Sequence, residues 1–119
     1  ATEAAYNEGE PWLEEAIGYI AKNFEFLDAF ITSSISSLKV LPMEATYLCW
    51  IDCRAFGLSD QKLDQLVMED AQIYMDAGHI FGPEGSGFIR LNLACPREII
   101  EKALQRLKSS IEQLEPKID

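Results

Sequence analysis

The sequence predicts one α/β domain, classed as α+β in some schemes, in which a long N-terminal helix and a C-terminal helix pack on a small mixed sheet. Two long segments, 11–31 and 96–114, carry apolar residues at the helical steps of three and four. Two shorter segments, 45–53 and 88–94, have the composition or the alternation of strands. The chain of 119 residues is 48% hydrophobic, which suits a single compact domain with one core.

The first helix is expected to begin at Pro11, because proline is favoured at the first helical position, where its missing N–H needs no partner. Its apolar residues form one stripe that we expect to face the core: Leu13, Ile17, Ile20, Phe24, Leu27 and Ile31. The polar residues 32–34 interrupt this pattern. A short extended piece at 37–41 is expected before Pro42.

The segment 45–53 has apolar residues on both faces, which is typical of a central strand. Gly57 ends it, and Ser59 or Asp60 can cap a second helix that runs to about Ala71. We expect a brief strand at 72–75 and then a glycine-rich loop at 78–87. Pro96 is expected to open the last helix and Pro116 to end it; this helix has a clean apolar stripe made of Ile100, Leu104, Leu107, Ile111 and Leu114.

The strand at 88–94 sets one arginine among residues that otherwise suit a core. Alternation sends Ile89 and Leu91 to one face and Phe88, Arg90 and Asn92 to the other. A guanidinium on a rigid strand can grip a carboxylate, because its planar fork makes two parallel charge-assisted hydrogen bonds. The residues alone leave a second interpretation open, in which Arg90 simply lies on the solvated face of a half-buried strand.

Charge and hydropathy exclude some classes of partner. The net charge of −10 repels phosphate backbones, so we expect no nucleic-acid partner. The strongly apolar windows are far shorter than a bilayer span and no leader opens the chain, so we expect no membrane partner and a cytoplasmic location. The chain begins without methionine and in the middle of a pattern, which suggests a piece of a longer protein.

Several other residues are expected to have structural roles. The three cysteines, Cys49, Cys53 and Cys95, have no spacing typical of a metal site or a disulfide framework, so we expect buried free thiols and no metal. The segment 82–87 leads into a strand and contains an acidic residue, which favours a turn over a phosphate cradle. We also expect a structural or surface role for His79, a local pairing of Asp52 with Arg54, and packing roles for Trp12 and Trp50.

Four segments together resemble a known family, in the family's order and spacing: 6–13, 44–52, 81–82 and 85–97. They are similar to the C-terminal region of class I/II aminotransferases, which are fold-type I enzymes dependent on pyridoxal phosphate, and especially to the cystathionine β-lyase or C-S lyase branch. The resemblance implies that 1–119 is a single C-terminal small domain, with 1–34 as a linking helix region and 35–119 as the sheet and its helices. The large domain that binds the cofactor would lie outside the chain. One position departs from the family, because Ala77 stands where a proline commonly precedes the glycine, and this leaves the loop shape open.

The resemblance also implies a function. The longer parent would be an aminotransferase or a C-S β-lyase that acts on amino acids such as cystathionine, uses pyridoxal 5′-phosphate and forms a homodimer. Arg90 would bind the substrate α-carboxylate, and no residue here is assigned to catalysis, cofactor or metal. None of the six lysines stands in the Schiff-base motif, so the chain alone is expected to be inactive: Lys22, Lys39, Lys62, Lys102, Lys108 and Lys117. The alternative from another class is a free-standing acidic module that acts by protein contacts alone.

Overall fold

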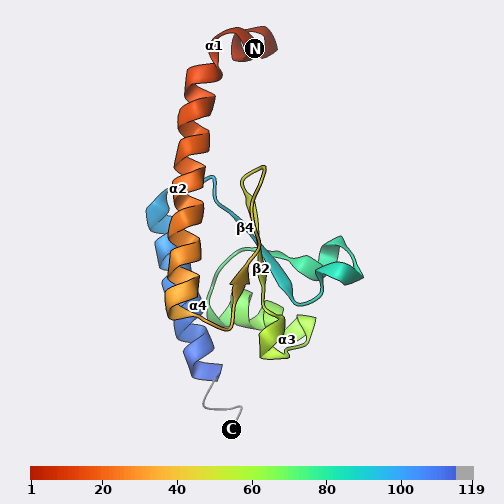
Figure 1. The fold of residues 1–119 in the computed structure, drawn as a ribbon. Coiled ribbons are helices and arrows are strands. Elements are labelled where there is room, and N and C mark those ends of the chain that lie inside the picture. Colours follow the sequence, from red (N-terminus) through yellow and green to blue (C-terminus); the bar gives the residue numbers. More distant parts are fainter. Residues whose placement is uncertain (115–119) are drawn as a thin grey trace.

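Two long helices pack against one face of a four-stranded antiparallel sheet in the computed structural model, which describes residues 1–114 (Figure 1). The strand order is β1-β2-β4-β3, and every neighbouring pair is antiparallel. The strands are β1 (Lys39–Val40), β2 (Leu48–Asp52), β3 (Asp76–Ala77) and β4 (Phe88–Asn92). The predicted fold class is confirmed in its α+β form, but the sheet is not mixed. A helical connection joins β2 to β3, which run in the same direction, yet β4 lies between them and keeps each pairing antiparallel.

The helices are α1 (Thr2–Glu8), α2 (Glu10–Ser34), α3 (Asp60–Asp64) and α4 (Arg97–Leu114). A π-helical turn (Gln65–Asp70) continues α3. Single 3₁₀ turns lie at Arg54–Phe56, Gly78–Phe81 and Pro83–Gly85. The three helices expected from the sequence are therefore confirmed, and Ser59 caps α3 by accepting a hydrogen bond from the Lys62 amide. The predicted end of the last helix at Pro116 lies outside the described residues.

The strand expected at 72–75 is wrong by a few residues. Gln72 has a φ of 54°, in the left-handed region, so the chain turns there and cannot continue a ladder. Pairing begins at Asp76, which lies opposite Arg90, and ends at Ala77, which lies opposite Ile89. Local composition suggested the earlier position, whereas the register with β4 selects the later one.

The core lies between one face of the sheet and the helices. Cys49 and Ile51 of β2 and Ile89 and Leu91 of β4 are buried on this face. Helix α4 meets them with the predicted stripe, of which four members are buried: Ile100, Leu104, Leu107 and Ile111. The predicted stripe of the long helix is only partly confirmed. Within residues 1–114 no helix is both long and apolar enough to cross a membrane.

The stripe of α2 divides in two because the helix is longer than the surface that it covers. Leu27 and Ile31, near its C-terminal end, are fully buried. Leu13 and Ile17 are 51% and 56% exposed, since this part of α2 extends beyond the sheet, with α1 at its far end (Figure 1). The core role expected for these two residues is therefore wrong for this chain by itself. Trp12 is 72% exposed for the same reason, so its expected packing role is also not met.

A buried asparagine fixes α2 to the junction between β4 and α4. Asn23 is fully buried, and its Nδ2 donates hydrogen bonds to the carbonyls of Leu93 and Cys95, both at 3.0 Å. Its Oδ1 accepts a hydrogen bond from Nε of Arg97 at 3.2 Å. One turn earlier, the hydroxyl of Tyr19 accepts from the Arg97 amide at 3.0 Å. All polar groups of the Asn23 side chain are thus engaged in one junction.

Replacing Asn23 is expected to destabilise the protein strongly. Asn23→Ala leaves two carbonyl oxygens and Arg97 without their partner, so we expect a loss of about 2–4 kcal/mol in the free energy of unfolding. Urea denaturation measures this loss. The exposed Asn7→Ala in α1 is the matched control and should change the midpoint little; equal midpoints for the two variants would contradict the role of Asn23.

Candidate functional site

The face of the sheet that does not meet the core carries Arg90. It shares this face with Trp50, which lies directly opposite in β2, and with Asp76, which lies directly opposite in β3. The side chain of Arg90 is 22% exposed, whereas its neighbours Ile89 and Leu91 are buried on the other face. The alternation predicted for this strand is confirmed, although the strand ends at Asn92 rather than at residue 94.

Aromatic rings lie beside the guanidinium. The central carbon of the Arg90 guanidinium is 4.3 Å from the centroid of the Phe81 ring and 5.9 Å from that of Trp50. Trp50 meets Phe81 and Phe88 edge to face, with centroids 5.6 and 6.4 Å apart, which confirms its packing role. A cation over an aromatic face is stabilised by the ring quadrupole. Phe81 was not assigned to this site from the sequence, because the neighbours of a loop residue depend on the folded path of the loop and leave no periodic pattern in the sequence.

An acidic side chain holds one edge of Arg90. Oδ2 of Asp76 accepts hydrogen bonds from Nη2 at 2.7 Å and from Nε at 3.0 Å. Both side-chain hydrogen bonds that Arg90 makes within residues 1–114 go to this one oxygen, so Nη1 has no partner there. Sequence reasoning missed Asp76, because it placed the strand at 72–75. Pairing of a second strand with the Arg90 strand, so that an acidic residue lies directly opposite Arg90, is the signal that would have identified Asp76.

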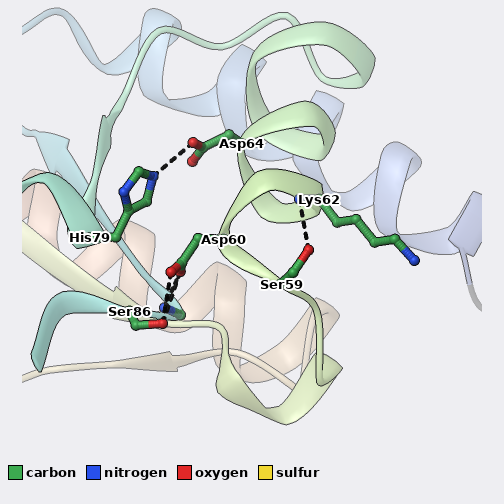
Figure 2. Close-up of polar contacts among 7 residues, drawn as sticks. Ser59, Asp60, Lys62, Asp64, His79 and Ser86 are labelled. Carbon is green, nitrogen blue, oxygen red and sulfur yellow. Dashed lines mark hydrogen bonds and ion pairs between the residues drawn. The ribbon is translucent and has the colours of Figure 1, made fainter. Parts of the chain in front are cut away.

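The loop that carries Phe81 is tied to α3 by two polar contacts (Figure 2). The carboxylate of Asp60 accepts from the Ser86 hydroxyl at 2.9 and 3.0 Å and from the Gly87 amide at 3.0 Å. Nε2 of His79 lies 2.8 Å from Oδ2 of Asp64. These contacts fix both ends of the loop on one short helix. They give His79 the structural role at the surface that the sequence suggested.

Close backbone approach also shapes this loop. A side chain on Gly78 would meet the Gly85 carbonyl oxygen at 2.2 Å, and one on Gly85 would meet the Gly78 carbonyl oxygen at 2.0 Å. The two glycines therefore allow two segments of the loop backbone to come into contact. The Gly87 amide already donates to Asp60, so this glycine-rich segment forms a turn rather than a cradle for a phosphate group.

The remaining candidates have local roles. Asp52 accepts hydrogen bonds from the backbone amide and the side chain of Arg54, at 2.8–3.0 Å, as the sequence predicted. The hydrogen bond from the Arg54 side chain is the main reason that the pKa of Asp52 lies below its usual range. Cys49 and Cys53 are buried free thiols, as predicted, and burial raises the pKa of each to about 12; Cys95 is only partly buried. Among residues 1–114 no group of His, Cys, Asp and Glu side chains is placed to hold a metal ion.

Comparisons with known proteins give a consistent set of relatives. PatB, a cystathionine β-lyase of Bacillus subtilis strain 168, is 39% identical over 111 residues, which cover 93% of this chain and 29% of PatB. Cystalysin from Treponema denticola, whose crystal structure contains pyridoxal 5′-phosphate, matches with a TM-score of 0.91 and 37% identity. This match covers 94% of this chain and 28% of cystalysin. A C-S lyase from Staphylococcus hominis, bound to the same cofactor, matches with a TM-score of 0.83 and 31% identity over 92% of this chain and 29% of that one.

The coverage is as informative as the identity. Nearly all of this chain aligns, but it spans less than a third of the length of the curated relatives that it matches. No family model matches the chain. The similarity therefore concerns one part of those proteins, and the described Arg90 site lies within that part.

The contact between His79 and Asp64 predicts a pH dependence. The hydrogen bond with Asp64 raises the pKa of His79 above its ordinary value of 6.5. The contribution of this contact to stability is therefore fully present below about pH 6.5 and is lost as the pH rises through the raised pKa.

We expect Asp64→Asn to lower the free energy of unfolding at pH 6 and to have a smaller effect at pH 9. Urea denaturation of the two proteins at both pH values measures the difference. Asp70→Asn, at an exposed acidic position on the following helical turn, is the control. An equal loss at the two pH values would show that the charge of His79 plays no part.

Proposed function

This chain belongs to the cystathionine β-lyase branch of the class I/II aminotransferase family, and from this membership we propose that it is the C-terminal small domain of a longer enzyme, in which Arg90 binds the α-carboxylate of an amino-acid substrate. The chain spans 29% of PatB and 28% of cystalysin, which supports a parent of several hundred residues. The parent is proposed to be a C-S β-lyase that acts on cystathionine-like amino acids. The aminotransferase reaction is the second candidate.

The state of Arg90 is the observation that carries this proposal. Its guanidinium lies on the open face of the sheet, with Asp76 at one edge and Phe81 at one planar face. The Nη1 end has no partner within residues 1–114. A carboxylate approaching that end can accept from both terminal nitrogens, which is the geometry that distinguishes arginine from lysine. The interpretation of Arg90 as a merely solvated residue explains neither its low exposure of 22% nor its fixed position.

The surface at the N-terminal end supports attachment to a further domain. Five large apolar residues are exposed along α1 and α2: Tyr6, Trp12, Leu13, Ile17 and Tyr19. We call this set the N-terminal apolar surface. All of its members except Tyr6 line an apolar groove that continues to Tyr47 and Pro96. Exposed apolar surface of this extent marks a contact with another part of a protein, and we propose that the large domain covers it. This also explains why Leu13 and Ile17 of the predicted stripe of α2 are exposed here.

The cofactor is proposed to be pyridoxal 5′-phosphate, bound mainly by residues outside this chain. The glycine-rich segment 82–87 does not fit the phosphate group, because the amide of Gly87 and the hydroxyl of Ser86 are bonded to Asp60. The cofactor supplies an electron sink for the substrate α-carbon, while the protein supplies orientation and electrostatics. In this division Arg90 orients the substrate, an effect of geometry that can strongly favour the reaction.

The reaction type is tested on the full-length protein. We expect cystathionine to release thiol and pyruvate without an added acceptor, and residues 1–119 alone to release neither. Formation of glutamate that depends on 2-oxoglutarate, without thiol release, would instead identify an aminotransferase. If the full-length protein catalyses neither reaction on any amino acid, the non-catalytic interaction module becomes the better interpretation. The homodimer and the cytoplasmic location that the sequence suggested stay predictions.

Replacing Arg90 tests the site. In the full-length enzyme, Arg90→Ala should lower kcat/KM by roughly 30- to 700-fold, which corresponds to the loss of about 2–4 kcal/mol for a charged hydrogen-bonded partner. Arg90→Lys should recover only part of the loss, because lysine keeps the charge without the fork. The matched control is Arg54→Ala, which removes the other arginine paired with an aspartate on this face. Unchanged kinetics in Arg90→Ala would remove Arg90 from the site.

A further inference from the structure

We propose that Asp76 is the positioning residue that sets the direction of the Arg90 fork. This inference rests on the proposed role of Arg90 in binding the substrate carboxylate. Asp76 does not touch the substrate in this arrangement. It acts through Arg90, by holding one edge of the guanidinium so that the opposite end faces out from the sheet.

The hydrogen bonds of Asp76 leave one end of Arg90 available. A guanidinium has one edge formed by Nε and Nη2 and an outer end formed by Nη1 and Nη2. Oδ2 of Asp76 accepts from both donors of the first edge, at 3.0 and 2.7 Å. The outer end keeps both hydrogens of Nη1 and one of Nη2. A substrate carboxylate can therefore bind there in bidentate form without displacing Asp76.

The backbone fixes Asp76 in this place. Asp76 and Arg90 are directly opposite residues in the β3–β4 ladder, so their side chains leave the sheet on the same face. The ring of Phe81, 4.3 Å from the guanidinium carbon, covers a planar face of Arg90. One edge and one face are thus occupied by groups on different elements. A long side chain that is held in two directions loses less freedom when its ligand binds, and this preorganisation favours binding.

A competing interpretation gives Asp76 the opposite effect. A carboxylate of the protein can occupy the guanidinium donors that the substrate carboxylate would use. Removal of such a carboxylate strengthens substrate binding. The geometry favours positioning, because Asp76 binds the inner edge through a single oxygen rather than the outer end through two. The two interpretations differ in the sign of the change in KM.

The experiment uses the full-length enzyme with its cofactor. Asp76→Ala removes the partner of Arg90. Asp76→Asn keeps the size of the side chain and one acceptor oxygen but removes the negative charge. We expect Asp76→Ala to raise KM for cystathionine about tenfold, the size typical of coupling between contacting residues, and to change kcat less. Asp76→Asn should recover part of this loss. Propionate, an unreactive carboxylate, probes the same site directly, and its inhibition constant should rise in parallel with KM.

The control matches Asp76 in type and face. Asp52 is also an aspartate on the open face and is also paired with an arginine, but its partner is Arg54. Asp52→Ala should leave KM and the propionate inhibition constant unchanged. The variants are repeated in an Arg90→Ala background, where the effect of Asp76→Ala on KM should disappear. If Asp76→Ala does not fold, Asp76→Asn and the propionate measurement carry the test.

Each other outcome overturns the inference in a recognisable way. A lower KM in Asp76→Ala would show that Asp76 competes with the substrate. An equal change with and without Arg90 would show that Asp76 does not act through it. No change in Asp76→Ala, together with a raised KM in Arg90→Ala, would reject the role of Asp76 and leave the proposed function standing. An unchanged KM in Arg90→Ala itself would reject both.

Discussion

The register of β4 between β2 and β3 is the constraint on which the core and the site both depend. Side chains alternate along a strand, so burial of Ile89 and Leu91 obliges Arg90 to face the other way. The same register sets Trp50 and Asp76 on either side of Arg90. A slip of one residue would bury a guanidinium in an apolar core and expose the aliphatic side chains. The register of β4 that buries Ile89 and Leu91 is therefore also the one that sets Arg90 between Trp50 and Asp76.

Asn23 fixes the position of α2 against the chain that leaves β4. Its side chain bonds to two carbonyls just after β4 and to Arg97 at the start of α4. A buried polar group is tolerated only where its hydrogen-bonding capacity is met, so α2 can pack on this junction in one position. An apolar side chain could slide along the core, whereas an amide bonded to three groups cannot. Asn23 therefore contributes specificity of docking as well as stability.

The sequence predicted what depends on local pattern and missed what depends on register or on neighbours. The alternation of 88–94 and the stripe of α4 were enough to place Arg90 on the open face and Leu104 in the core. Asp76 was missed because a two-residue strand has no pattern of its own and forms only where β4 offers a partner. Phe81 was missed because its place follows from the folded loop. The stripe of α2 was overextended, since periodicity shows which face is apolar but not what covers it.

Mechanically, α2 resembles a rigid arm. Its 25 residues span about 37 Å, at the usual rise of 1.5 Å per residue. Asn23 clamps the arm near its middle to the chain that leaves β4, only a few residues beyond Arg90. A tilt of about 5° around this clamp would move the N-terminal end of α2, about 20 Å from Asn23, by roughly 2 Å. A contact that moves Trp12 and Ile17 therefore strains the Asn23 junction, which lies only a few residues beyond Arg90.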